Sequence, residues 1–309
     1  MGQLINTFSW SLSRQQMFEE CRRRYFLHYY RAWGGWADDA DPAARLAYRL
    51  KQMVTLEMWI GDIVHRLIES QLTRLRGGYR PHPKPLCERA RSLLNAEWRQ
   101  STDRLWRENP KHNRNLFEHY YGVNVDKEKR ASLRERLFVC LQNFCSLPLV
   151  ERLLPLDPAG WLSVEQFDTF EVDRVPVYVK LDCAVRLDGR TLVIDWKTGR
   201  ASDKDLDQVA CYALYAMHKW GVKLEDLRVM PVYLLSNEAA ERAVAPEDAL
   251  AMQEKIVSGI HAMRECLADP AANTAREEDF PMTDQPRRCR RCNFHEICFG
   301  PGPIEPDEA

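Results

Sequence analysis

The sequence predicts an α/β protein with a helical N-terminal half and a sheet-bearing C-terminal half. Apolar residues recur at helical spacing up to about residue 160, and from about residue 161 they alternate with polar residues with a period of two. Asp188-Gly189 stands between two alternating runs, which is typical of a two-residue β-hairpin. A chain of 309 residues, 45% of them hydrophobic, can bury a core of ordinary size as one large domain or two smaller ones.

Four helices are expected in the first half. The first begins within "SLSRQQMFEE", where Ser13 and Gln16 match a capping box, and it carries Cys21 on about its second turn. The others are expected over about 46–75, 84–107 and 128–153, with glycines and prolines breaking the chain after 46–75. The first half is therefore mostly helical.

Strands dominate the second half. Alternation predicts strands over 161–172 and over both arms of 175–199, which are followed by a helix over 205–220, a strand over 227–236 and a helix over 246–266. A tail with three cysteines completes this order. We divide the chain into an N-terminal helix (1–45), a helical region (46–160), a strand-bearing core (161–270) and a cysteine tail (271–309).

Composition narrows the class of protein. The N-terminus lacks the basic segment and apolar core of a signal peptide, and no apolar run approaches the roughly 18 residues of a membrane span. We therefore expect a cytoplasmic protein without membrane contact, in which ten cysteines indicate a metal or a cluster rather than disulfides. The net charge of -1 does not by itself indicate a nucleic-acid partner, and no phosphate-binding loop of a nucleotide motor is present in the sequence.

The predicted hairpin brings two carboxylates together. If Asp188-Gly189 forms the loop, Leu187 pairs with Arg190, and Asp182 then lies opposite Asp195. Directly opposed side chains are about 4.5–5.5 Å apart, so the two carboxylates repel each other unless a proton or a cation compensates.

A divalent cation such as Mg²⁺ would bind this polar face. Lys197, two residues beyond Asp195, projects from the same side of the strand and could orient or help deprotonate a metal-bound water. This is the chemistry of phosphodiester hydrolysis. The alternative is an exposed polar hairpin face with an ordinary ion pair between Lys197 and an aspartate.

Two helical motifs accompany the hairpin. "GDIVHRLIE" places Gly61, His65 and Glu69 at four-residue steps on one helical face, and "DQVACYALYA" places Gln208 and Tyr212 four residues apart. Each spacing is weak evidence alone, because a lone helical histidine is more often a packed or surface residue than a ligand.

In this order, "GDIVHRLIE", "KLDCAVRLDGRTLVIDWKTG" and "DQVACY" resemble the PD-(D/E)XK nuclease superfamily in its RecB-like branch, from about residue 9 to 299. The resemblance implies a restriction-endonuclease-like core, a mixed central sheet flanked by helices, and a Mg²⁺- or Mn²⁺-dependent deoxyribonuclease. The resemblance assigns His65, Asp182 and Asp195 as metal ligands. It assigns Lys197 as the catalytic lysine, and Gln208 and Tyr212 as accessory residues.

Two further acidic residues fit the resemblance. Glu69 matches an H-x-x-x-E pattern and is expected to support the ligands, and Glu165 is a weaker candidate for the acidic residue that some members place before the hairpin. One position departs from the pattern, because Trp196 stands where a tyrosine is common.

Three cysteines near the end of the chain, Cys289, Cys292 and Cys298, need a fourth ligand. His295 within the same stretch could complete a zinc knuckle. The resemblance implies instead Cys21 and a 4Fe-4S cluster, because cluster-bearing members of the branch use one upstream and three terminal cysteines. Such a cluster would close a loop of more than 250 residues and act as a structural clasp.

The expected function is a RecB-like exonuclease that acts on single-stranded DNA or DNA ends in repair, CRISPR adaptation or phage defence, with DNA and a helicase or defence protein as partners. The alternative is an iron–sulfur DNA-binding or assembly subunit with an idle nuclease site. A zinc-binding structural protein is a third hypothesis. Cleavage by the parent protein separates the first two, and the colour and metal content of anaerobically purified protein separate cluster from zinc.

Overall fold

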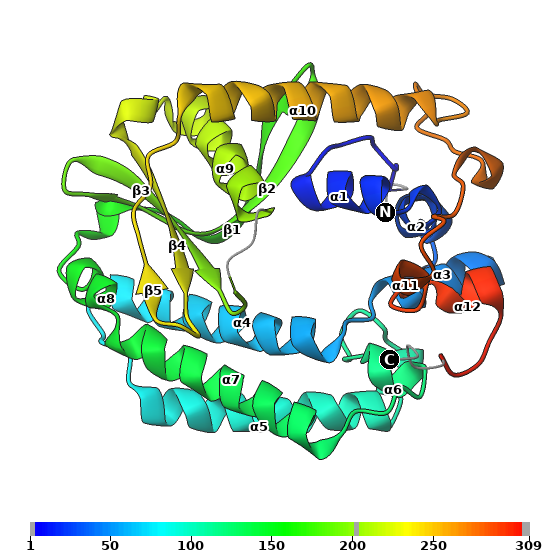
Figure 1. The fold of residues 1–309 in the computed structure, drawn as a ribbon, viewed down its shortest axis with the longest axis horizontal. Helices are drawn as coiled ribbons and strands as arrows, with labels where there is room; N and C mark the ends of the chain where they lie inside the picture. Colours follow the sequence, from blue (N-terminus) through cyan, green and yellow to red (C-terminus); the bar gives the residue numbers. More distant parts are fainter. Residues whose placement is uncertain (1–3, 201–203, 305–309) are drawn as a thin grey trace. The chain divides into compact units, whose positions relative to one another are not determined.

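The computed structural model describes residues 4–200 and 204–304, which form two compact units (Figure 1). The first unit combines residues up to 59 with 95–126 and the chain from 258 onward, and the second combines 60–94 with 127–257. Each unit is thus assembled from segments that are far apart in the sequence. The four-segment division predicted from the sequence stays a prediction.

The elements follow the predicted order of a helical half and then strands. The helices are α1 (Leu12–Glu20), α2 (Arg22–Phe26), α3 (Pro42–Lys51), α4 (Leu56–Arg76), α5 (Pro83–Thr102), α6 (Phe117–Tyr120), α7 (Lys127–Ser146), α8 (Pro148–Leu153), α9 (Lys204–Trp220), α10 (Pro246–Glu265), α11 (Pro286–Cys289) and α12 (His295–Phe299). The strands are β1 (Trp161–Val172), β2 (Val175–Leu187), β3 (Arg190–Lys197), β4 (Leu227–Tyr233) and β5 (Glu238–Ala239).

The first helix differs from its prediction at both ends. Ser11, not Ser13, is the N-cap of α1, and its side chain accepts a hydrogen bond from the Arg14 amide. Cys21 does not lie within the helix, because its backbone is extended (φ -167°) and its sulfur accepts from the Arg24 amide at the start of α2. The capping box on Ser13 and the helical placement of Cys21 were therefore wrong.

Two longer predicted helices are each divided. The stretch 46–75 contains the end of α3 and nearly all of α4, separated by residues 52–55. The stretch 128–153 contains α7 and α8, and the break falls at Leu147, whose backbone is extended (ψ 133°). A residue before proline avoids the helical region, so Pro148 ends α7 and begins the next helix.

The sheet is mixed and has the order β1-β2-β3-β4-β5, in which only β3 and β4 are parallel. Leu187 pairs with Arg190 as predicted, and Asp188 (φ 52°) and Gly189 (φ 76°) form the two-residue loop. Both central residues are left-handed, as a type I′ turn requires. The short strand β5 was not predicted. The five-stranded mixed sheet confirms the α/β class and agrees with a PD-(D/E)XK core.

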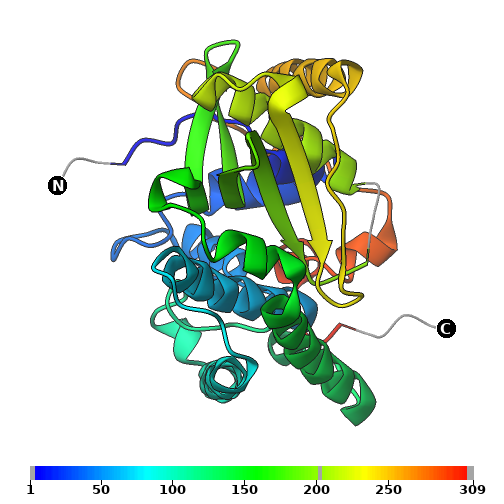
Figure 2. The same ribbon diagram turned by 90° about the vertical axis from the view of Figure 1, so that its left-hand side faces the viewer.

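Helices cover both sides of the sheet within the second unit (Figures 1 and 2). On α9, the Tyr215 hydroxyl donates to Asp168 of β1 at 2.9 Å, and the Tyr215 ring packs edge-on against Phe170. On α7, Phe144 packs edge-on against Trp196 of β3 with ring centroids 5.4 Å apart. These contacts bury the apolar side chains that the alternating pattern assigns to the core.

In the first unit, residues near the N-terminus pack against residues near the C-terminus. The rings of Tyr25 and Phe280 stack with centroids 5.9 Å apart. Arg23 forms an ion pair with Glu277 at 2.6 Å, and its Nε donates to the Phe280 carbonyl at 2.8 Å. The two terminal regions are therefore held together by ordinary packing as well as by any group that the cysteines bind.

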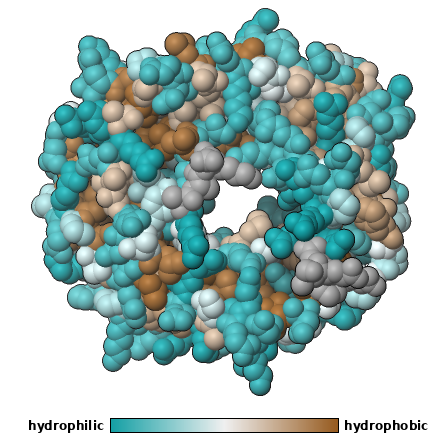
Figure 3. Space-filling model, viewed as in Figure 1, coloured by the Kyte–Doolittle hydropathy of each residue, from teal (hydrophilic) through white to brown (hydrophobic). Residues whose placement is uncertain are grey.

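The surface in Figure 3 is predominantly hydrophilic, and its hydrophobic side chains lie in separate small patches. Among the helices of the described residues, none combines the length and the apolar character that crossing a membrane requires.

Candidate metal and nuclease site

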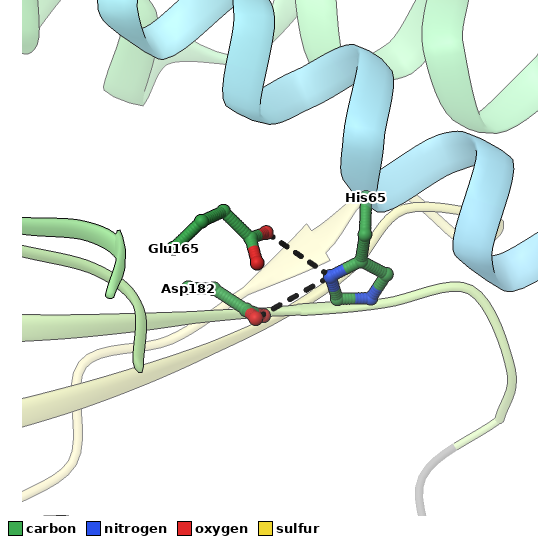
Figure 4. A group of neighbouring side chains, drawn as sticks. All are labelled: His65, Glu165 and Asp182. Atoms are coloured by element: carbon green, nitrogen blue, oxygen red, sulfur yellow. Dashed lines mark ion pairs between the residues drawn. The ribbon is translucent and has the colours of Figure 1, made fainter. Parts of the chain in front are cut away.

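Three side chains from three elements meet in the second unit (Figure 4). His65 extends from α4, Glu165 from β1 and Asp182 from β2, and their ligand atoms all lie within 4.8 Å of one another. The Nδ1 atom of His65 is 3.3 Å from Asp182 Oδ1 and 3.5 Å from Glu165 Oε1. We refer to His65, Glu165 and Asp182 as the triad.

Glu165 reaches the triad through an unusual backbone. Its φ is +49°, the left-handed region that costs a non-glycine residue about 1 kcal/mol or more. Residues 164 and 166 pair with β2 on either side of it. The side chain is only 1% exposed, and its carboxylate forms an ion pair with Lys180 at 2.6 Å. Sequence reasoning gave Glu165 too little weight, because no glycine or asparagine marks the left-handed position.

A second group continues from the triad along β3 and α9. Asp195 Oδ2 is 2.7 Å from the Lys197 ammonium group. Its Oδ1 accepts hydrogen bonds from Gln208 Nε2 at 3.1 Å and from the Tyr212 hydroxyl at 3.3 Å. Lys197 also donates to Gln208 Oε1 and lies 3.5 Å from Asp205 Oδ1. The four-residue spacing of the α9 motif thus places both side chains against one carboxylate.

The β2–β3 ladder ends just before the two aspartates. Its last pair is Cys183 with Ile194, and Asp182 Oδ2 then accepts a hydrogen bond of 2.8 Å from the Trp196 amide. The register is therefore as predicted, but Asp182 and Asp195 are not a ladder pair. Asp195 is also outside the triad's 4.8 Å group, so its role as a metal ligand stays a prediction.

Charge couples the two groups. Burial of Asp195, together with the neighbouring Asp182 carboxylate, raises the pKa of Asp195 to about 6, although Lys197 and His65 act in the opposite direction. Burial of His65 lowers its pKa, but hydrogen bonds to Asp182 and Glu165 outweigh this effect and raise the pKa to about 10. Without a metal, the imidazole is a cation between two carboxylates at neutral pH.

The remaining residues of the α4 motif lie where the sequence placed them. Glu69 is one turn beyond His65 and lies near Lys180. Burial lowers the pKa of the Lys180 ammonium group, but Glu165, Asp182 and Glu69 outweigh this effect, so the pKa is raised. At Gly61, an added Cβ would lie 3.3 Å from Thr198 Oγ1, so the glycine lets α4 approach the end of β3 closely.

The triad offers one imidazole nitrogen and two carboxylates, a donor set suited to Mn²⁺ or Mg²⁺. Both Glu165 oxygens are buried and accept no hydrogen bond from the described residues beyond their ion pairs. Buried carboxylate oxygens are costly without a partner, and a divalent cation would supply one. The residues present therefore fit a divalent metal.

The first unit contains a separate pocket lined by all four predicted cluster cysteines. We call it the cysteine pocket. Burial is the largest cause of the raised pKa of Cys289, Cys292 and Cys298, and the nearby Cys21 thiol contributes to the increase at each of them. Burial with these neighbours raises the pKa of Cys292 and Cys298 to about 11. Cys21 and the terminal three thus meet in one place.

Two details bear on what the cysteine pocket binds. Sulfur ligands around one zinc ion are about 3.8 Å apart, given ~2.3 Å bonds in a tetrahedron. Among the residues that the structure describes, only the triad has three such ligand atoms within 4.8 Å, so no three of these sulfurs are that close. His295 also lines the cysteine pocket, and its buried Nδ1 has no hydrogen-bond partner within the described chain.

No curated protein sequence matches the chain significantly. Residues 9–299 match the PD-(D/E)XK nuclease superfamily, whose members are generally metal-dependent nucleases. The match covers both the triad on α4, β1 and β2 and the Asp195–Lys197 group that adjoins it. The chain belongs to the PD-(D/E)XK nuclease superfamily.

Proposed function

We propose that the protein is a divalent-metal-dependent deoxyribonuclease. The observation that carries this proposal is the convergence of the triad with the carboxylate–lysine pair of β3 in one buried region of the second unit. Superfamily membership makes phosphodiester hydrolysis the reaction class. The geometry supports specific roles within it.

His65, Asp182 and Glu165 would hold Mg²⁺ or Mn²⁺, with Asp195 as a further ligand. A bound divalent cation would neutralise charge on the phosphate and lower the pKa of a water molecule. Lys197, fixed by Asp195 and Gln208, would direct its ammonium group at the attacking oxygen and stabilise the charge that develops there. Gln208 and Tyr212 would keep the Asp195 carboxylate in position.

Substitutions in the Asp195–Lys197 pair test these roles. Asp195→Ala and Lys197→Ala should each lower the rate of DNA cleavage in Mg²⁺ by about 10²-fold or more. The matched control is Asp168→Ala, which removes a carboxylate of the same sheet that is bound by Lys219 and Tyr215, each at 2.9 Å, and lies outside the triad and the Asp195–Lys197 pair. Cleavage by both variants at the parental rate would refute the assignment. An inert parent that still binds DNA would favour an idle nuclease site.

We also propose that Cys21, Cys289, Cys292 and Cys298 hold a 4Fe-4S cluster. Their shared pocket, and the contribution of the Cys21 thiol to the raised pKa of Cys292 and Cys298, support four thiolate ligands. Arg24 also lines the pocket and would offset the negative charge of a thiolate-bound cluster. Anaerobic purification should give a brown protein with iron and sulfide in equal amounts. A colourless protein with zinc would refute the cluster.

For substrate and context, we propose a RecB-like exonuclease that acts on single-stranded DNA or DNA ends. The proposed contexts are repair, CRISPR adaptation and phage defence, with a helicase or defence protein as partner. Single-stranded, double-stranded and circular DNA labelled at either end should separate these activities. Progressive shortening from one labelled end is expected, whereas cleavage of circular DNA would indicate an endonuclease.

A further inference from the structure

A stacked pair of aromatic side chains lies on the outer part of the sheet. Phe167 of β1 and Tyr178 of β2 are nearly parallel, with an interplanar angle of 13° and ring centroids 4.8 Å apart. Phe167 is 65% exposed, although β1 is an edge strand of the sheet. Exposed apolar side chains on an edge strand favour aggregation, so proteins usually place charges there.

The pair shares a sheet face with the acidic side chains of the triad. Phe167 lies directly opposite Lys180 in the β1–β2 ladder, and opposed residues project to the same face. Tyr178, Lys180 and Asp182 follow at two-residue steps along β2, so they also project to that face.

The other face of β1 is already covered. Asp168 bonds to Tyr215 of α9, and the Phe170 ring contacts Tyr215 as well. The α9 helix therefore occupies the face opposite to Phe167. The Phe167 ring and the Lys180 side chain, which is 56% exposed and pairs with Glu165, both reach solvent on the face opposite to α9.

We propose that Phe167 and Tyr178 form a stacking platform for an unpaired nucleobase of the substrate strand. The inference rests on the proposed nuclease function and specifies its substrate as single-stranded nucleic acid. A base must be unpaired and unstacked from its neighbours to lie on a protein ring, and base–aromatic stacking is tolerant of sequence. Lys180, between the platform and the triad, would attract the phosphates that connect them.

The separation between the platform and the triad determines how many nucleotides lie between the stacked base and the phosphate that is cleaved. Tyr178 and Asp182 are four residues apart on β2, which corresponds to about 13 Å of strand. Stacked nucleotides advance about 3.4 Å each along a strand, and extended ones advance further, so the platform lies about two to four nucleotides from the phosphate that is cleaved. The stacked base would thus anchor the strand while the triad acts at a fixed distance from it.

The test compares a normal single strand with one in which a single abasic position is moved along the strand. For the parent protein, an abasic position at one register, about two to four nucleotides from the cut, should raise KM by roughly 5- to 150-fold, with less effect on kcat. Phe167→Leu keeps an apolar side chain without a π-face and should remove the difference between the two strands. Phe167→Trp should restore it, and Leu250→Ala, at an exposed site on α10, should leave it unchanged.

The outcomes separate this inference from the nuclease assignment. Equal KM values for normal and abasic strands at every register in the parent, or an unchanged discrimination in Phe167→Leu, would overturn the platform even if DNA is cleaved. The same comparison by fluorescence anisotropy in Ca²⁺ measures binding without turnover. If the parent cleaves no DNA but still binds the normal strand more tightly than the abasic one, the stacking platform is supported and the nuclease assignment is refuted.

Discussion

At the scale of residues, the imidazole of His65 is the most informative group. In the metal-free protein its pKa is about 10, because Asp182 and Glu165 outweigh the effect of burial. A histidine binds a metal ion through its neutral imidazole, so a cation that binds the triad has to displace the proton of His65. Metal binding and proton release are therefore linked at this histidine.

This linkage predicts how metal affinity depends on pH. A raised pKa means that the protonated imidazole stabilises the fold below about pH 6.5 and loses this effect as pH rises through about 10. Between pH 7 and 8.5, Asp195, with a pKa of about 6, is already ionised. Mn²⁺ binding should then release about one proton, and affinity should rise about tenfold per pH unit.

Calorimetry in buffers of different ionisation enthalpy measures this proton directly. His65→Gln should bind Mn²⁺ more weakly and release none, whereas Asp168→Asn should behave like the parent. An affinity that does not change with pH in the parent would show that His65 is not a ligand.

At the scale of elements, α7 supports the strand that carries Asp195 and Lys197. Phe144 is fully buried against Trp196, which lies between these two residues in the sequence. A cavity at this contact would loosen β3 at the position where its side chains must be fixed.

Phe144→Ala should therefore lower the free energy of unfolding by about 3–5 kcal/mol and reduce kcat. Urea denaturation followed by circular dichroism measures the first effect, and a cleavage assay measures the second. Phe138→Ala, on the same helix but only half-buried, should cost less and leave kcat unchanged. Equal losses in the two variants would show that the Trp196 contact has no special role.

Local patterns predicted the sheet better than the helices. Period-two alternation and Asp188-Gly189 fixed the β2–β3 register, because pairing follows directly from a two-residue turn. Helix ends depend on caps that several nearby residues could provide, so Ser11 was missed in favour of Ser13. The break at Leu147 was predictable from Pro148, but helical spacing on both sides concealed it.

In the candidate site, too, local sequence patterns identified some residues and missed the contacts of others. Spacing singled out the residues of the two helical motifs and the hairpin, because each lies on a regular element, and the family resemblance assigned their predicted roles. The contacts of Glu165 depend on its left-handed backbone, and the ion pair of Lys180 depends on how β1 and β2 are paired. Neither feature can be read from local sequence. The meeting of Cys21 with the terminal cysteines followed only from the family resemblance, since local sequence does not specify contacts across such a separation.

At the scale of the whole chain, the cysteine pocket joins two segments that also pack directly. Asn273 donates to the Asn6 carbonyl at 2.8 Å, and Arg288 donates to the Glu20 carbonyl at 3.2 Å. A cluster would add to these contacts by closing a long loop. A longer closed loop removes more conformational entropy from the unfolded chain, and this stabilises the folded state. The fold would therefore weaken without the cluster but not disappear.

Cys21→Ser and His295→Ala distinguish the two possible ligand sets. Cys21→Ser should lose iron and sulfide and lower Tm by several degrees, consistent with a loss of a few kcal/mol. His295→Ala should keep the full iron content. Loss of metal only in His295→Ala would establish a zinc knuckle and refute the clasp.

We propose that one metal site, built on the triad, cleaves DNA. The most direct test is the cleavage of end-labelled single-stranded DNA in Mn²⁺ by the parent and by Asp182→Asn, which keeps the shape of the side chain but removes its charge. We expect cleavage by the parent, none by Asp182→Asn at any Mn²⁺ concentration, and DNA binding by both proteins. Cleavage by Asp182→Asn at the parental rate, or an inert parent in both Mn²⁺ and Mg²⁺, would contradict this proposal.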